Sequence, residues 1–398
     1  MGPAGPAGMD YRPAVYIGSE ACAECHSDLY ASFMRSGHPY KLTRIVDGHP
    51  PTFPFSEVPS PPEGYTWDDI FYVIGGFGWK ARFIDQQGYI ITGDADAKTQ
   101  YNLANDVLRT QPHWVAYNAG VENKPYDCGA CHTTGYVPIG NQHGLPGLIG
   151  TWAEDGIGCE ACHGPGSSHA NDPYLVKATI VRDAESCTRC HARGDATNQF
   201  QAEDGFISHH EEYADFFHSK KQVMRCIDCH DPHATTKYAE PGQATRVRCE
   251  SCHFEQAQYQ RMTDRLHAEC IDCHMPRVIR NAAGDPARHT GDMRTHLMAI
   301  NPQMIRQFTD NGAPTQPHLA LESACMSCHN DTTRVGALPE EQLVAAAVDY
   351  HDRDQAGSLN RQRSRATRGE TPAATPEPQA TAAPAEETPP TDDTGDDE

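Results

Sequence analysis

The sixteen cysteines of this 398-residue chain fall into eight pairs that share one spacing. Two residues separate the cysteines of each pair and a histidine follows the second, so every segment reads C-x-x-C-H. We number these motifs 1 to 8 in chain order. Their cysteines are Cys22/Cys25, Cys128/Cys131, Cys159/Cys162, Cys187/Cys190, Cys226/Cys229, Cys249/Cys252, Cys270/Cys273 and Cys325/Cys328. The histidines that complete them are His26, His132, His163, His191, His230, His253, His274 and His329.

A C-x-x-C-H segment is suited to covalent attachment of haem. Its two thiols can each add to one vinyl group of a haem, and the next residue then ligates the iron as the proximal histidine. A zinc knuckle or a redox-active C-x-x-C has no use for a histidine after every pair. Histidine makes up 22 of 398 residues, so eight such coincidences have a chance of about 10⁻¹⁰. We predict eight covalently attached haem c groups, with disulfides between adjacent motifs as the alternative.

Fourteen further histidines could supply the second axial ligands of the irons. Eight would fill the distal position of every haem, and the predicted distal ligands are His38, His113, His169, His218, His233, His267, His296 and His318. His289 competes with His296 for this role. The predicted bystanders are His49, His143, His209, His210 and His351.

The composition indicates a weak side-chain core. The hydrophobic share is 38%, with 33 glycines and 30 prolines, and the mean hydropathy is -0.64. A chain so rich in turn formers should bury little aliphatic surface and form few long helices or strands. We therefore predict a mainly α and irregular multihaem fold, in which short helices and loops wrap around eight haems that supply the apolar interior.

A few segments carry clear secondary-structure signals. Residues 28–34 suggest a short helix that leads to His38, and residues 339–348 suggest another with a proline in its first turn. Residues 70–74, 79–84 and 89–92 are rich in β-branched and aromatic side chains and predict a small β hairpin or meander near 66–92. The glycine-rich run 75–78 lacks the lysine of a phosphate loop, so a tight bend is the better interpretation.

The motif positions divide the chain into five predicted regions. The steps between motifs 2 to 8 are unequal, which argues against one strict repeat. The regions are a flexible arm at 1–15, an N-terminal region with motif 1 and the β element at 16–127, a haem-rich region with motifs 2 to 8 at 128–330, a helix and linker at 331–369, and a disordered acidic tail at 370–398.

Charge and hydropathy restrict partners and location. The net charge of -22 offers no basic surplus for a nucleic acid. No stretch approaches the roughly 18 to 20 apolar residues of a membrane span, and no apolar signal region follows Met1. We expect the flexible arm at 1–15 to be either what remains after removal of a signal or anchor, or the product of a misplaced start codon. Since haem c is attached outside the cytoplasmic membrane, we expect the periplasm, the cell surface or the extracellular space.

The motifs and their flanks resemble multihaem c-type cytochromes over roughly residues 16–330. Segments 16–22, 36–38 and 158–166 look like tetrahaem electron carriers of ammonia oxidisers. Segments 226–233 and 270–276 are similar to the octahaem reductase and hydroxylamine oxidoreductase superfamily. The resemblance implies closely stacked bis-histidine haems, with one open haem in the enzymes.

Two markers of those enzymes differ in this chain. Nitrite reductases of the group carry lysine in place of one motif histidine, whereas all eight motifs here end in histidine. Hydroxylamine oxidoreductases tie a tyrosine to the catalytic haem and continue with long helices, whereas Tyr350 is the only tyrosine after His329. Tetrathionate-reductase-like enzymes can use a lysine outside the motif.

Three functions follow. The leading hypothesis is an electron carrier of extracytoplasmic respiration that exchanges electrons with other redox proteins. The second is a reductase or oxidoreductase of nitrogen or sulfur compounds such as nitrite, hydroxylamine or tetrathionate, with Arg109, His113 and Tyr117 as a polar cluster near one open haem. The third is a homo-oligomer, a subunit of an extracellular cytochrome filament. The sequence favours the carrier and leaves the question of an enzyme open.

Overall fold

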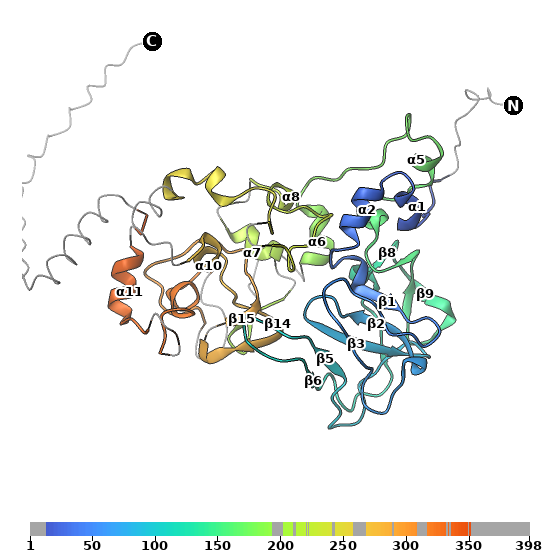
Figure 1. The fold of residues 1–398 in the computed structure, drawn as a ribbon, viewed down its shortest axis with the longest axis horizontal. Coiled ribbons are helices and arrows are strands. Elements are labelled where there is room, and N and C mark those ends of the chain that lie inside the picture. Colours follow the sequence, from blue (N-terminus) through green and yellow to red (C-terminus); the bar gives the residue numbers. More distant parts are fainter. Residues whose placement is uncertain are drawn as a thin grey trace, which may run out of the picture. The chain divides into compact units, whose positions relative to one another are not determined.

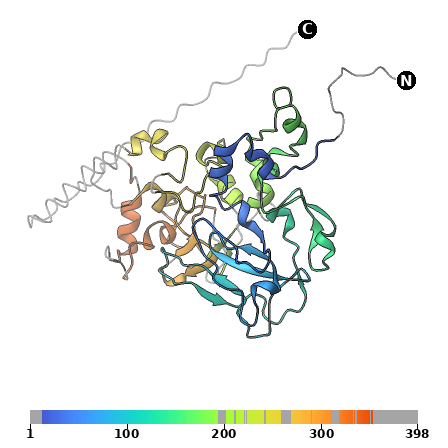
Figure 2. The same cartoon turned by 45° about the vertical axis from the view of Figure 1, so that its right-hand side comes forward.

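An antiparallel sheet surrounds the strands predicted near residues 66–92. In the computed structural model, β2 (Ile70–Gly75) pairs with β3 (Lys80–Asp85), and β3 pairs with β4 (Tyr89–Ile90). The predicted meander is present, but the sheet is larger. It also contains β1 (Leu42–Arg44), β5 (Gln100–Asn102), β6 (His113–Val115) and β7 (Lys124–Pro125). The sheet lies beside helices α1 and α2 in both views (Figures 1 and 2).

The structure describes residues 13–351 except 193–201, 210–211, 220, 222, 241–242, 258–267, 289, 309–316, 332, 334–335 and 349. The acidic tail and most of the N-terminal arm lie outside these residues. The five regional boundaries stay predictions.

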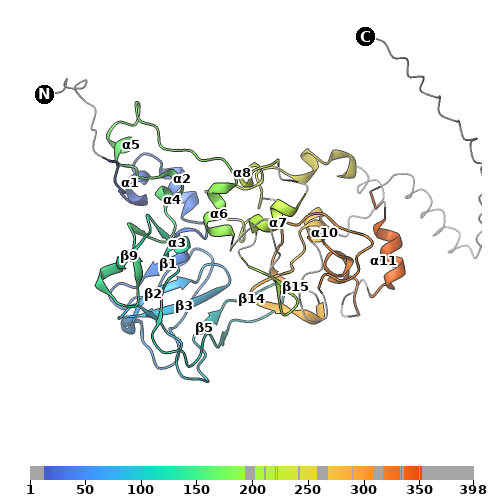
Figure 3. The same ribbon diagram turned by 180° about the vertical axis from the view of Figure 1, so that it is seen from behind.

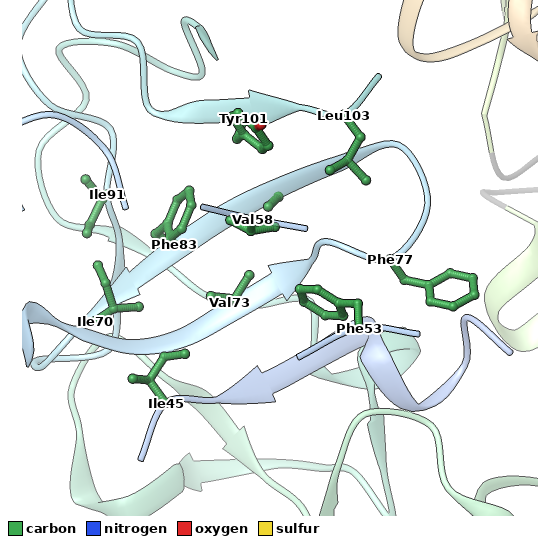
Figure 4. Packing of buried hydrophobic residues seen from close by; sticks show 11 residues of the cluster. Ile45, Phe53, Val58, Ile70, Val73, Phe77, Phe83, Ile91, Tyr101 and Leu103 are labelled. Atoms are coloured by element: carbon green, nitrogen blue, oxygen red, sulfur yellow. The ribbon is translucent and has the colours of Figure 1, made fainter. Parts of the chain in front are cut away.

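One face of the first sheet holds a cluster of apolar side chains (Figure 4). Val73 on β2 is the cross-strand partner of Phe83 on β3, and both are fully buried. The ring centroids of Tyr101 and Trp114 lie 5.1 Å apart on the neighbouring strands β5 and β6. The β-branched and aromatic residues that predicted these strands therefore pack against each other across the sheet.

The bend between β2 and β3 depends on two glycines. Gly75 and Gly76 have φ of 75° and 94°, which L side chains rarely adopt. A Cβ at Gly76 would also lie 2.5 Å from the ring of the buried Phe53, whereas one at Gly78 would meet only Lys237, at 3.6 Å. The predicted tight bend is present.

We expect Gly76→Ala to lower the free energy of unfolding by about 3 kcal/mol, because it combines left-handed strain with a clash against Phe53. Gly78→Ala is the matched control, with a loss within about 0.5 kcal/mol. Urea unfolding followed by far-UV circular dichroism measures both. Equal effects of the two changes would contradict this account of the bend.

A second sheet contains four strands from two distant segments. They are β12 (Ala202–Glu203), β13 (Phe206–Ser208), β14 (Ile279–Asp285) and β15 (Thr290–Met293), and β13 runs parallel to β14. The carboxylate of Asp292 accepts the backbone N–H groups of residues 281–283, which holds the irregular start of the β14–β15 pair. The Asn102 side chain donates to the Ala282 carbonyl at 3.1 Å, which joins the two sheets. The sequence did not indicate this sheet.

The helices are short, as predicted for a chain of low regular secondary structure. They are α1 (Ser19–Ala23), α2 (Ser27–Phe33), α3 (Gly129–His132), α4 (Cys159–His163), α5 (Ser167–Asn171), α6 (Glu185–His191), α7 (Glu212–His218), α8 (Cys226–Cys229), α10 (Cys270–His274) and α11 (Glu340–Ala347). The 3-10 helices are η1 (Pro39–Lys41), η2 (Trp67–Asp69), η3 (Gln142–Gly144), η4 (Cys249–Ser251) and η5 (Pro286–Arg288). A short π-helix, η6 (Glu322–Met326), contains the first cysteine of motif 8.

Both predicted helices are present as α2 and α11, and Pro339 caps α11. The remaining strands form two small pairs, β8 (Thr133–Thr134) with β11 (Glu154–Asp155) and β9 (Val137–Asn141) with β10 (Ile149–Thr151). Within the described ranges, no helix combines the length and the apolar character that crossing a membrane would need.

Candidate haem-binding sites

The motifs form tight helical turns that bring each pair of thiols together. In motifs 1, 5, 6 and 8 the backbone N–H of the histidine donates to the carbonyl of the first cysteine, at 2.8–2.9 Å. Two cysteines three residues apart then share one face of the turn. All sixteen cysteines lie among the described residues and none of them is in a disulfide, so no disulfide joins adjacent motifs. The turns thus present pairs of thiols as haem c attachment requires.

The predicted attachment cysteines differ in how far they are covered by the protein. Ten are partly buried and six are exposed. The exposed ones are Cys25, Cys128, Cys162, Cys249, Cys252 and Cys328.

Exposure does not remove these cysteines from their motifs. The backbone N–H of Cys25, Cys252 and Cys328 donates to the carbonyl of the first cysteine of the same motif, at 3.3, 3.2 and 3.1 Å. Each therefore stays in the turn that pairs it with its partner thiol. The assignment of all sixteen cysteines as attachment residues stays a prediction.

Four motif histidines each face a second histidine, with similar distances between the ring centroids. The ring centroids are separated by 6.3 Å for His26 and His169, 6.5 Å for His191 and His38, 6.2 Å for His163 and His233, and 6.0 Å for His230 and His296. Two imidazoles that bind one metal through bonds of about 2 Å have centroids about 6 Å apart. Four predicted distal ligands therefore lie where an iron could join them to a motif histidine.

Backbone carbonyls orient the rings of three motif histidines, of which one, His163, belongs to a facing pair. Nδ1 lies 3.1 Å from the Lys41 carbonyl in His132, 2.6 Å from the Thr179 carbonyl in His163 and 2.8 Å from the Met298 carbonyl in His274. Since a carbonyl oxygen can only accept, Nδ1 carries the proton in each ring. The lone pair on Nε2 is left for a metal, which is the usual arrangement of a ligating histidine.

Burial keeps two of the facing histidines neutral. Burial, with a contribution from Lys41, lowers the pKa of His38 to about 3. Burial and the neighbouring His230 lower the pKa of His296 to about 4. At neutral pH both rings therefore have the uncharged form that binds metals.

His191 has a different environment. Its Nδ1 lies 3.3 Å from the Glu212 carboxylate, and this hydrogen bond raises the pKa of His191. A carboxylate on Nδ1 makes an imidazole a more basic ligand. We therefore expect the pair of His191 and His38 to join a more basic ligand to a less basic one.

Two buried carboxylates hold the backbone around these sites. Glu160, inside motif 3, accepts the backbone N–H groups of Ile17 at 3.0 Å and Gly18 at 2.8 Å, which ties α1 to α4. Asp215 on α7 accepts the Thr295 hydroxyl and the backbone N–H of His296, the latter at 3.1 Å. The sequence did not indicate either carboxylate, because an isolated carboxylate in a loop-rich chain carries no local signal.

The other four predicted distal ligands have different positions. His113 is exposed on β6, where its Nδ1 bonds with the nearby Gln111 carbonyl at 2.9 Å. His218 and His318 are close to each other, and burial together with His318 lowers the pKa of His218. His267 lies outside the described residues. All eight distal assignments stay predictions, those of the four facing pairs included.

The three members of the predicted polar cluster, Arg109, His113 and Tyr117, have different neighbours. Arg109 lies in an exposed turn with φ of 55°, and the Tyr117 ring packs under the Arg82 guanidinium at 3.5 Å. Of the predicted bystanders, His143 bonds with the Tyr72 hydroxyl at 3.1 Å, and His49 bonds with the Asp47 carbonyl at 2.8 Å.

The remaining predicted bystanders have no role assigned by this geometry. His209 and His351 are among the described residues, whereas His210 lies outside them, as does His289, which the sequence analysis placed in competition with His296.

One close contact was not foreseen. The Lys221 ammonium lies 2.7 Å from Nε2 of His253, the histidine of motif 6. Lys221 is one of two adjacent lysines in a polar stretch, so no sequence signal distinguished it.

The cysteines of different motifs are also adjacent. Thiols share hydrogen bonds between motifs 1 and 3 (Cys22 and Cys159), 2 and 4 (Cys131 and Cys190), 4 and 5 (Cys187 and Cys226), and 6 and 7 (Cys249 and Cys270). Further pairs interact electrostatically between motifs 3 and 4 (Cys162 and Cys187), 5 and 6 (Cys229 with both Cys249 and Cys252), and 7 and 8 (Cys273 with both Cys325 and Cys328).

Contacts between elements agree with these pairs. Helix α1 packs against α4, α3 packs against α6, and α10 packs against η6. In Figure 3 the elements α4, α6, α8 and α10 follow one another across the view. The motifs therefore form one connected series, with motif 2 beside motif 4.

Comparisons with known proteins agree with this geometry. A family model for cytochrome c7 and related cytochrome c matches residues 110–192. The dissimilatory sulfite reductase MccA of Wolinella succinogenes is 22% identical over 371 residues, which cover 66% of this chain and 51% of that protein. The chain thus spans about half the length of this curated relative.

Two solved structures share the fold. The outer cell wall cytochrome OcwA superposes with a TM-score of 0.54 at 19% identity, covering 89% of this chain and 90% of that one. The octahaem sulfite reductase MccA of Wolinella succinogenes superposes with a TM-score of 0.54 at 18% identity, covering 89% of this chain and 72% of that one.

Proposed function

Because the chain is a multihaem c-type cytochrome that binds haem c, we propose that it carries electrons along eight haems outside the cytoplasm. When bound, each haem supplies reversible one-electron chemistry at its iron. The observation that carries the proposal is the adjacency of the motif cysteines. In the mature protein these sulfurs are thioethers at the edges of the haems, so neighbouring sulfurs mean neighbouring haem edges.

The proposed order of the sites is 1, 3, 4, 5, 6, 7, 8, with site 2 beside site 4. Thiols share hydrogen bonds at the steps 1–3, 4–5 and 6–7 and interact electrostatically at the steps 3–4, 5–6 and 7–8. Site 2, which lies beside this order, shares a thiol hydrogen bond with site 4. This order differs from the order of the motifs in the sequence.

The facing histidines favour a carrier over an enzyme at four of the sites. A distal histidine leaves no position on the iron for a substrate. Rings held by Nδ1 hydrogen bonds and by buried backbone contacts keep the same geometry in both oxidation states, which favours fast electron transfer.

Three measurements test the proposal. Intact mass spectrometry should give eight haems beyond the 43.7 kDa polypeptide. A reductive titration should then take up eight electrons per chain. Turnover with sulfite, nitrite, hydroxylamine and tetrathionate should not exceed that of free haem. Fewer than eight haems would reject the cofactor count, and steady turnover would reject the role of a simple carrier.

A second candidate function is reduction of a sulfur or nitrogen oxyanion. The observation in its favour is the similarity to a dissimilatory sulfite reductase over 66% of the chain. Sulfite turnover in the same assay separates this function from the first, since only an enzyme consumes sulfite while an electron donor is oxidised.

The proposed extracytoplasmic location is supported by the fold shared with an outer cell wall cytochrome. Protease treatment of intact cells, followed by haem staining of the fractions, tests it. The redox partners we propose are other cytochromes or a terminal acceptor. The filament hypothesis predicts end-to-end polymers in electron micrographs of the native protein, and monodisperse particles would dismiss it.

A further inference from the structure

We propose that Lys221 is the distal axial ligand of the haem carried by motif 6. The motif histidine, His253, faces the Lys221 nitrogen through Nε2, the atom that a proximal histidine offers to iron. No histidine was assigned to this motif by spacing in the sequence. The inference rests on the proposed haem at motif 6, but not on the proposed conduction.

The main chain around Lys221 is held from both sides. Its backbone N–H donates to the Ser219 hydroxyl at 3.1 Å, and its carbonyl accepts the backbone N–H of Met224 at 2.8 Å. Ser219 is itself buried at the end of α7, where its hydroxyl donates to the Phe216 carbonyl at 2.7 Å. These two backbone hydrogen bonds fix the turn that directs the partly buried Lys221 side chain toward motif 6.

The charge of Lys221 acts on the motif groups that surround the proposed site. The ammonium lies against His253. The ammonium also interacts with the thiols of Cys229 and Cys249, in motifs 5 and 6. The lysine nitrogen is therefore next to the place where the haem edges of both sites would lie.

The spacing can accommodate an iron. Two nitrogen ligands on opposite sides of a metal with bonds of about 2 Å are about 4 Å apart, so Lys221 must withdraw by little more than 1 Å from its 2.7 Å contact. Its stem of four methylene groups allows this without a change in the backbone. To bind iron, the ammonium would give one proton to solvent and offer its lone pair to the metal.

Near-infrared magnetic circular dichroism of the oxidised holoprotein tests the assignment, because imidazole–amine and bis-imidazole irons differ in their charge-transfer bands. We expect one haem-equivalent of the imidazole–amine signal in the wild type. Lys221→Ala should abolish that signal and convert one haem to the high-spin state, which binds carbon monoxide when reduced. Lys221→His should instead give one more bis-imidazole haem.

Lys177→Ala is the matched control, because Lys177 is exposed and its ammonium donates to the Pro173 carbonyl at 3.1 Å. It should leave all bands unchanged. A wild type without the imidazole–amine band, or a Lys221→Ala protein with an unchanged spectrum, overturns the assignment.

Haem counting by mass spectrometry on every variant shows separately whether eight haems are attached, and so distinguishes this failure from failure of the proposed function. If Lys221→Ala loses a haem, Lys221→His decides, since it keeps a nitrogen ligand.

Discussion

Replacing Cys187 and Cys190 of motif 4 with alanine is expected to interrupt electron flow between the two ends of the chain. Motif 4 has adjacent cysteines in motifs 2, 3 and 5, so the loss of this haem leaves sites 1 and 3 without a neighbour on the way to sites 5 to 8. Single-molecule junction conductance should fall by most of its wild-type value. Intact mass should show the loss of one haem in eight.

The matched control removes the haem of site 2, which lies beside the proposed main order. Changing Cys128 and Cys131 of motif 2 to alanine should also cost one haem in eight, but site 2 lies beside the main order and not within it. Conductance should stay close to the wild-type value. Equal conductance of the two variants would show that the proposed order is wrong. Loss of more than one haem from either variant would point to misfolding, and His191→Ala, which keeps both thioethers of motif 4, then serves as the test.

Asp215→Ala should destabilise the protein by about 3 kcal/mol. The Asp215 side chain has no exposed surface, and its loss would leave the Thr295 hydroxyl and the backbone N–H of His296 without their acceptor. Each unsatisfied buried donor costs about 1–3 kcal/mol. Because the His296 backbone is then free to move, we also expect the haem of motif 5 to gain high-spin character, visible in electron paramagnetic resonance.

Asp204→Ala is the control for a carboxylate in an exposed place. Asp204 pairs with Arg280 at 2.9 Å, and its side chain is 70% exposed, so the expected loss is below about 1 kcal/mol. Urea unfolding gives both values. A stable Asp215→Ala protein with unchanged spectra would mean that His296 does not depend on this carboxylate.

The sequence predicted the parts of the molecule that depend on local pattern. Eight motifs with one spacing predicted haem c, and runs of β-branched residues predicted β2, β3 and β4. The short strands β5, β6 and β7 were missed because two or three residues of mixed composition carry no alternation. The second sheet was missed because β13 and β14 come from distant segments, and only the tertiary fold makes them neighbours.

For the same reason, the sequence could not predict which distal histidine faces which motif histidine. His38 follows motif 1 closely in the sequence, yet it faces His191 of motif 4, whereas His26 of motif 1 faces His169, which follows motif 3. Proximity along the chain therefore indicated candidate histidines, but not which motif histidine each of them faces. Lys221 carried no pattern at all, and only the fold brings it to His253.

The facing histidines have a mechanical consequence as well. An iron bound between His26 and His169 would cross-link segments about 140 residues apart. Irons at the other three pairs would close loops of their own. A cross-link of that span lowers the conformational entropy of the unfolded chain by an equivalent of about 5 kcal/mol at 25 °C. Each metal centre would then stabilise the folded chain through ligand bonds to the iron. The cofactors would in this way compensate for the small apolar core of a chain rich in glycine and proline.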